Sequence, residues 1–432
     1  MIFSLIVFCL TILTLILLII KKPYIFIKGR RVQTFYFAPV IGAICLLIVQ
    51  QGLANSFMQQ ITTDNEVNPI KILILFLCIS FLSVVIDYLN FFDYIANWCV
   101  NHFQKSQFHL FFTFYILISI LTIFTSNDII ILTFTPIICL FSKKMKINPI
   151  PYLIMEFVTA NTFSMLLPIG NPTNIYLTNF FHISFIEYVS TMIIPTLISG
   201  IVSFLLLILL FHKKLKIEIK CDYQEQVHIE HKKLLIISLV HLGVCLLSLC
   251  FSNFLKVEMY IICLITSCSL SIILIIASII KRQNFINDCF LKLPFNLIPF
   301  LLSMFILVLS LEKVGVFVHI ASFYNQINNE YILRYFYGFG SLFSANILNN
   351  IPMTLAYSFI IEEANITSFT SSIYPCIIAS NIGAFLTPIG SLAGIMWLDI
   401  LKTKEVHYGF KEFLKYGLII APLSLTLSLL FL

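Results

Sequence analysis

Residues 380–394 read SNIGAFLTPIGSLAG, and residues 160–174 read ANTFSMLLPIGNPTN. In both stretches an Asn is followed seven residues later by Pro-Ile-Gly and a polar residue, and the two copies lie 220 residues apart. Proline interrupts a helix because it lacks a backbone N–H and clashes with the preceding turn. Apolar runs, YPCIIA and IMWL, flank the second copy. A single motif of this kind is usually a simple kink. Its duplication favours two functional helix breaks inside a membrane.

The composition predicts a polytopic membrane protein made of helices. Of 432 residues, 59% are hydrophobic and only 11% are charged, whereas soluble domains are about 25% charged. Long apolar runs favour helices over a barrel, whose strands are short and alternate in polarity. The net charge of +6 comes from loops between these runs, which is typical of membrane insertion and gives no reason to expect a nucleic-acid partner.

Three kinds of chemistry have no signature in the sequence. The twelve cysteines form no CxxC pair, so we expect no metal site and no redox motif. The phosphate-binding pattern GxxxxGK[ST] is absent, so we do not expect the chain itself to hydrolyse ATP. No nucleophile–base–orienter set is evident, so we expect no enzyme and no cofactor.

About ten apolar runs are long enough to cross a membrane. They cover residues 1–20, 33–52, 70–90, 150–178, 185–211, 233–252, 257–280, 289–311, 373–400 and 413–431.

Two further apolar regions, 107–142 and 331–360, carry polar residues near their middle, TSND at 125–128 and NILNN at 346–350. We expect each to be a re-entrant helical hairpin, because the loop charges are then strongly biased to one side. With both termini outside, the cytoplasmic loops hold most of the basic residues, among them Lys21, Lys22, Arg30, Arg31, Lys143, Lys144, Lys146, Lys213, Lys214 and Lys216.

This reading gives two halves with the same order of elements and opposite orientation. Residues 1–211 form the first inverted repeat, with a broken helix at 150–178, and residues 233–432 form the second, with a broken helix at 373–400. Residues 212–232 form a cytoplasmic linker. Asn127-Asp128 and Asn349-Asn350 occupy matching hairpin tips, 222 residues apart. Many secondary transporters share this plan and bind substrate where the broken helices meet near the midplane.

These phrases resemble the ion transporter superfamily over nearly the whole chain. NNIPM at 349–353, LTPIGSLAGIMW at 386–397 and NDIIILTFTPI at 127–137 are most similar to arsenite and antimonite permeases. GNPTN at 170–174 looks more like the divalent anion/sodium symporter branch. The tips Ser126-Asn127-Asp128 and Asn349-Asn350-Ile351 depart from the Ser-Asn-Thr of sodium-coupled dicarboxylate carriers.

The resemblance implies that the tips and breaks hold the substrate and the coupling ion, H⁺ or Na⁺. It also implies a homodimer and, for an arsenite permease, an accessory ATPase as a partner. The predicted binding residues are Ser126, Asn127, Asp128, Asn161, Thr162, Asn171, Thr173, Asn174, Asn349, Asn350, Asn381, Thr387 and Ser391, and the predicted helix breaks are Pro168, Gly170, Pro388 and Gly390.

Two acidic residues are candidates for proton coupling. Asp128 lies at a hairpin tip, where a carboxylate inside a membrane is costly and suggests function; capping of backbone amides is the alternative. Glu156 lies on the helical face that leads to Asn161, with an interfacial Glu as the alternative.

We therefore expect a multi-pass carrier in the cell membrane that exports arsenite or antimonite by alternating access. The first alternative is a Na⁺-coupled importer of a small anion or dicarboxylate, and the second is a Na⁺/H⁺ antiporter. A channel is a less favoured alternative, because two matched breaks are typical of carriers.

Overall fold

A computed structural model describes residues 2–22, 24–27, 30–50, 52–63, 68–103, 106–219, 227–366 and 368–432. Part of the predicted linker, residues 220–226, lies outside them. The described chain is helical apart from one antiparallel strand pair, β1 (Tyr24–Ile27) and β2 (Arg30–Gln33), with Tyr24 opposite Gln33. The polytopic, all-helical membrane class predicted from composition is thus correct, and the small strand pair was not foreseen.

The helices are numbered along the chain. The first half contains α1 (Ile2–Lys21), α2 (Phe37–Val49), α3 (Leu53–Thr62), α4 (Pro69–Tyr88), α5 (Phe91–Phe103), α6 (Gln107–Phe124), α7 (Asn127–Met145), α8 (Ile150–Phe163), the 3₁₀ turn η1 (Pro168–Gly170), α9 (Pro172–Phe180) and α10 (Phe185–Leu215). The second contains α11 (Lys232–Cys250), α12 (Ser252–Leu255), α13 (Met259–Lys281), α14 (Phe285–Leu291), α15 (Leu297–Lys313), α16 (Val316–Tyr324), α17 (Glu330–Leu348), α18 (Asn350–Glu363), α19 (Ile373–Ile382), η2 (Gly383–Phe385), η3 (Pro388–Gly390), α20 (Leu392–Thr403) and α21 (Phe410–Leu430).

Within the described residues, seven helices are long and apolar enough to cross a membrane, or nine if two bent pairs each count as one span. The bent pairs are α2 with α3 and α15 with α16. Ten spans were predicted, and two of them, 150–178 and 373–400, are not counted because each is divided into short helices. One span is added, because α6, which was expected to be half of a hairpin, is long and apolar enough to cross a membrane alone.

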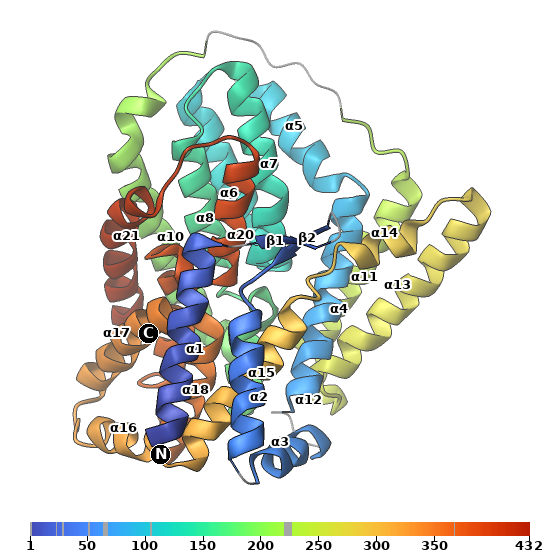
Figure 1. Cartoon of the computed structure of the whole chain (residues 1–432). Helices are drawn as coiled ribbons and strands as arrows, with labels where there is room; N and C mark the ends of the chain where they lie inside the picture. The colour runs from blue at the N-terminus through green and yellow to red at the C-terminus, as the bar shows by residue number, and fades with distance from the viewer. Residues whose placement is uncertain are drawn as a thin grey trace.

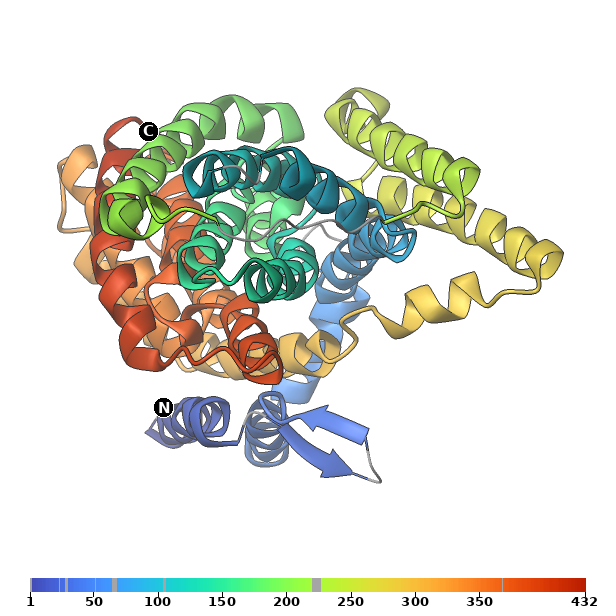
Figure 2. The same cartoon turned by 90° about the horizontal axis from the view of Figure 1, so that it is seen from above.

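The helices divide into a buried centre and an outer layer. Nearly every residue of α8, α9, α18 and α19 is buried, which is the pattern of helices surrounded by protein. The outer helices α10, α11 and α13 bury one stripe and expose Ile and Leu on the other side. In Figure 2, α1 and α2 form a separate layer along one edge, and α11 and α13 project at another.

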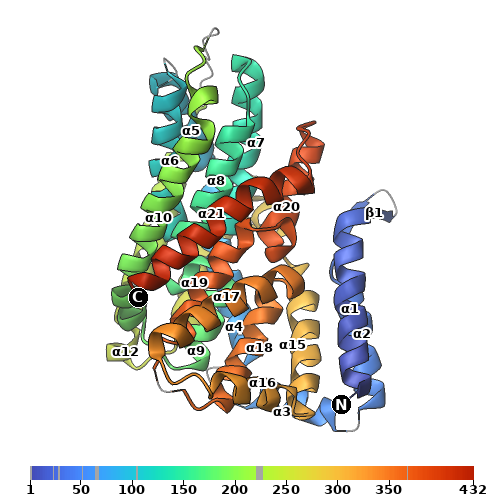
Figure 3. The same ribbon diagram turned by 90° about the vertical axis from the view of Figure 1, so that its left-hand side faces the viewer.

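Two segments share one order of elements. In 107–180 the pair α6–α7 is followed by α8, η1 and α9. In 330–403 the pair α17–α18 is followed by α19, η3 and α20, with the additional 3₁₀ turn η2 directly after α19. The long helices that come next, α10 and α21, pack against each other. Figures 1 and 3 show the short buried helices gathered between these outer helices and α4 and α15. The division into inverted repeats, and the side of the membrane that each end faces, stay predictions.

Candidate functional site

At the first helix break, the backbone of η1 lies directly against the end of α8. Helix α8 ends at Phe163, and η1 places Gly170 so near the end of α8 that an added Cβ would lie 2.1 Å from the Ser164 carbonyl oxygen. Asn171 then caps α9, its side-chain oxygen accepting from the Thr173 N–H at 3.2 Å. Pro172 opens α9, a position where its missing N–H costs nothing. Only glycine fits at position 170.

The second break repeats this construction. Helix α19 ends at Ile382, and a Cβ on Gly390 would lie 2.6 Å from the Gly383 carbonyl oxygen. Ser391 caps α20 by accepting from the Gly394 N–H at 3.1 Å. Thr387, in front of the break, donates to Asn346 Oδ1 at 2.7 Å. The same Pro-Ile-Gly-polar order therefore gives the same local structure twice.

A hydrogen-bonded cluster, here called the amide network, joins the two breaks. Its centre is Asn381 on α19, whose Oδ1 accepts from Ser164 Oγ at 2.9 Å and from Asn171 Nδ2 at 3.0 Å. The Nδ2 of Asn381 donates to Asn174 Oδ1 at 2.7 Å. Thr173 and Ser380 complete the network with an Oγ1–Oγ distance of 3.0 Å.

The amide network is buried and electrically neutral. Its six side chains, Ser164, Asn171, Thr173, Asn174, Ser380 and Asn381, are at most 2% exposed. Amide and hydroxyl oxygens can bind a hard cation, and the same groups can bind the hydroxyls of a neutral oxyacid. No group of three His, Cys, Asp or Glu side chains in the described part of the chain could hold a metal ion.

Each predicted hairpin tip contacts the broken helix that follows it in the chain. Asn127, the first residue of α7, donates to Asn161 Oδ1 on α8 at 3.0 Å. Asn349, between α17 and α18, donates to the Ile389 carbonyl oxygen in the second break at 3.0 Å. Asn349 has a φ of 79° and a ψ of 155°, a backbone conformation outside the left-handed helical region that residues with a side chain rarely adopt. Ser126 caps α7 in an extended conformation, so the two tips differ in detail.

The two acidic candidates occupy different places. Asp128 lies in the first turn of α7 and is 9% exposed; in the described residues its carboxylate has no hydrogen bond, although its N–H donates to Asn127 Oδ1 at 2.9 Å. Glu156 on α8 is fully buried and accepts from Thr135 at 2.8 Å. Its other oxygen, Oε2, and the Trp397 indole nitrogen are both buried without a hydrogen-bond partner in the described residues.

Not every predicted residue joins the network. Thr162 is buried with an unpartnered hydroxyl, and the Asn350 side chain makes no hydrogen bond to the described residues. Sequence reasoning missed Ser164, Ser380 and Asn346. Ser164 lies three residues after Asn161, and Ser380 lies one residue before Asn381. Their positions inside the duplicated phrase could have identified them as candidate binding residues.

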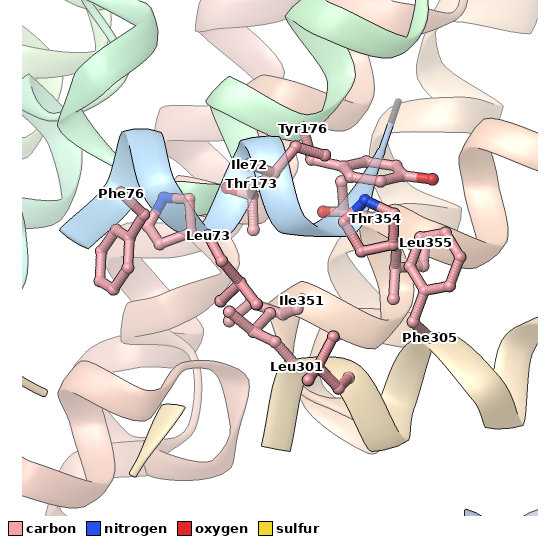
Figure 4. Close-up of a pocket in the computed structure, with 13 residues that line it drawn as sticks. Ile72, Leu73, Phe76, Thr173, Tyr176, Leu301, Phe305, Ile351, Thr354 and Leu355 are labelled. Atoms are coloured by element: carbon pink, nitrogen blue, oxygen red, sulfur yellow. The ribbon is translucent and has the colours of Figure 1, made fainter. Parts of the chain in front are cut away.

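An apolar pocket borders the amide network on one side (Figure 4). It is lined by α4, α9, α15 and α18, and Thr173 brings the network to its wall. Leu73, Tyr176, Phe305 and Ile351 also face it. The free volume is small, about 30 Å³, so the pocket is a narrow space where α9 and α18 meet α4 and α15.

Two ion pairs hold the ends of α4. Lys71 Nζ lies 2.7 Å from Glu258 Oε2, just before α13, and Lys292 Nζ lies 3.1 Å from Asp87 Oδ2. Asp87 also accepts from Thr133 on α7 at 3.0 Å. The second pair therefore connects α4 and the segment after α14 to the first hairpin.

A family model described as citrate transporter (CitMHS) matches residues 2–375. The arsenical pump membrane protein of Escherichia coli is 25% identical over 368 residues, which cover 82% of this chain and 83% of that protein. The arsenical pump membrane protein of Yersinia enterocolitica is 25% identical over 371 residues, with 82% and 83% covered. Human solute carrier family 13 member 4 is 39% identical over 67 residues, 16% of this chain and 10% of that protein.

Proposed function

This chain belongs to the citrate transporter family, and on that basis we propose that it is a secondary active carrier that exports arsenite or antimonite. The arsenical pump membrane proteins that it resembles over four-fifths of its length support this substrate class. We place the carrier in the cell membrane with both termini outside, as the loop charges predict.

The choice of substrate rests on the amide network, which has no charged side chain and therefore favours an uncharged substrate. Arsenite at neutral pH is mostly the uncharged trihydroxide, whose hydroxyls can donate to and accept from amides and hydroxyls. A citrate or dicarboxylate would bring charge into a buried site whose six side chains include no Lys, Arg or His. A buried charge without a partner is costly, so the network suits a neutral oxyacid better.

Transport against a gradient needs coupling, and two carboxyl groups are available for it. Asp128 lies at the tip that contacts Asn161 through its neighbour Asn127, and Glu156 lies on the same helix as Asn161. In our proposal one of them carries a proton while the other binds backbone or side-chain donors. The buried helices α6–α9 and α17–α20 move as the transport unit, and the pocket of Figure 4 lies at its boundary with the scaffold helices α4 and α15.

A Na⁺-coupled importer of a small anion is the second candidate. It is favoured by four helix N-termini, those of α7, α9, α18 and α20, which all begin at the tips or breaks. Helix N-termini attract anions because their N–H groups are unpaired and the helix dipole is positive there. The short match to human solute carrier family 13 member 4 agrees with this candidate.

Proteoliposomes separate the two candidates. We expect As(III) uptake driven by an imposed pH gradient, reduced at least tenfold in Asp128→Asn or Glu156→Gln and retained in the control Glu363→Gln, an exposed carboxylate at the end of α18. Sodium-driven citrate uptake without As(III) movement would contradict the arsenite carrier and support the second candidate. Gel filtration of each variant checks that it is folded.

A further inference from the structure

Two cysteine thiols meet between outer helices that the proposed transport site does not use. Cys245 on α11 and Cys263 on α13 have their Sγ atoms 3.8 Å apart, and both side chains are fully buried. Both thiols are free, and a disulfide would need a separation of about 2.05 Å. At 3.8 Å the two sulfur atoms touch without being bonded, and they are close enough for both to bond to one shared atom beside them.

The position of the pair is set by helix packing. Helix α13 packs against both α11 and α4, and Figure 2 shows α11 and α13 at the edge of the molecule. Thr266, one turn beyond Cys263, donates to the Cys263 carbonyl oxygen at 3.1 Å. No group of three His, Cys, Asp or Glu side chains that could hold a metal ion exists in the described residues. The site therefore offers two sulfur ligands.

We propose that Cys245 and Cys263 form a two-thiol binding site for trivalent arsenicals, separate from the amide network. Thiolates are soft ligands and select soft partners. An organic arsenical R–As(OH)₂ would form two As–S bonds, while two As–O bonds and two S–H bonds break and two waters leave. Arsenic stays trivalent, so the step needs no oxidant or reductant.

Such a bridge would tie α11 to α13 and stabilise this edge of the second half. A ligand that binds the folded chain alone raises its apparent stability by mass action. The inference does not rest on arsenite export, because a citrate or sodium-coupled carrier with these two cysteines would bind the arsenical equally well. Failure of arsenite transport in proteoliposomes would thus leave it standing.

The test uses the full chain, reduced and reconstituted in lipid nanodiscs, with phenylarsine oxide as the probe. Intact-protein mass spectrometry should show one adduct per chain that survives excess glutathione, a monothiol, and is removed by dimercaptopropanol, a dithiol. Cys245→Ser and Cys263→Ser should each lower the glutathione-resistant adduct at least tenfold. Cys250→Ser and Cys268→Ser remove unpaired cysteines of the same helices and should leave it unchanged.

A second measurement keeps the proposal testable if a buried Cys→Ser variant fails to fold. In the wild-type chain, the probe should protect Cys245 and Cys263 together from alkylation by N-ethylmaleimide after denaturation. A glutathione-resistant adduct that persists in both folded variants would overturn the proposal. Absence of any resistant adduct on the wild type, or protection of other cysteines instead, would overturn it too.

Discussion

Asn381 Nδ2 donates to Asn174 Oδ1 over 2.7 Å, although the two residues are 207 positions apart in the chain. Asn381 is also the acceptor for Ser164 and Asn171, so one side chain of the second half satisfies three of the first. Buried polar groups need such partners because leaving one unpaired costs more than forming the bond gains. The two helix breaks are therefore locked together, which agrees with their moving as one unit.

Replacing Asn381 by Leu should destabilise the fold and abolish transport. The change leaves Asn171 Nδ2 and Asn174 Oδ1 without a partner, whereas Ser164 Oγ still donates to the Asn161 carbonyl oxygen. Each unpaired buried group costs about 1–3 kcal/mol. We expect a lower midpoint of thermal unfolding in detergent and at least a tenfold loss of substrate uptake. Asn284→Ala, at an exposed N-cap without a side-chain bond, is the matched control. An Asn381→Leu protein with wild-type stability and uptake would show that the network is dispensable.

The sequence predicted the breaks better than it predicted the network. The Asn-x6-Pro-Ile-Gly spacing places interruptions near Pro168 and Pro388, where the structure has 3₁₀ turns, because proline and glycine act locally. The partners of Asn381 depend on how α19 docks on α8 and α9, which no local pattern records. The same holds for Glu156, whose neighbours Thr135 and Trp397 come from α7 and α20.

Gly170→Ala should prevent correct closure of the first break. The added methyl would lie 2.1 Å from the Ser164 carbonyl oxygen, and a backbone atom cannot move aside as a flexible side chain can. Overpacking typically costs about 1–3 kcal/mol, and we expect that loss with a matching fall in uptake. Gly390→Ala should behave alike, with 2.6 Å to the Gly383 carbonyl oxygen.

The internal control for this prediction is Gly243→Ala in α11. No atom lies within 4 Å of the Cβ it would add, and alanine favours a helix over glycine by about 0.5–1 kcal/mol. Thermal unfolding should show a neutral or slightly stabilising effect. Equal destabilisation by all three substitutions would contradict the steric explanation.

The two ion pairs of α4 should differ in their contribution to stability. The Lys71 side chain is 10% exposed and its partner Glu258 34%, whereas Lys292 is 48% exposed and Asp87 21%. Lys71→Met should cost about 1.5–3 kcal/mol, the usual range for hydrogen bonds to charged groups. Lys292→Met should cost less than about 1 kcal/mol, because water screens exposed pairs. Denaturant titration of both variants side by side gives the comparison, and a larger cost for Lys292→Met would refute it.

Asp93 lies in α5 on the predicted cytoplasmic side, and its ionised carboxylate should lower the stability of the folded chain. Acidification should remove this destabilising effect. Burial raises the pKa of Asp93 above its ordinary value of 3.8, with the nearby Asp87 charge adding to the rise and Lys292 opposing it. A raised pKa means that the folded chain binds the proton more tightly than the unfolded chain does, so stability falls as pH rises from about 4 through the folded-state pKa. Asp93→Asn should therefore unfold at a higher temperature than the wild type at pH 7, and the difference should shrink towards zero as the pH is lowered to about 4. Thermal melts of both proteins across this range provide the measurement, and a difference that stays constant with pH would assign the effect to amide hydrogen bonding rather than to titration.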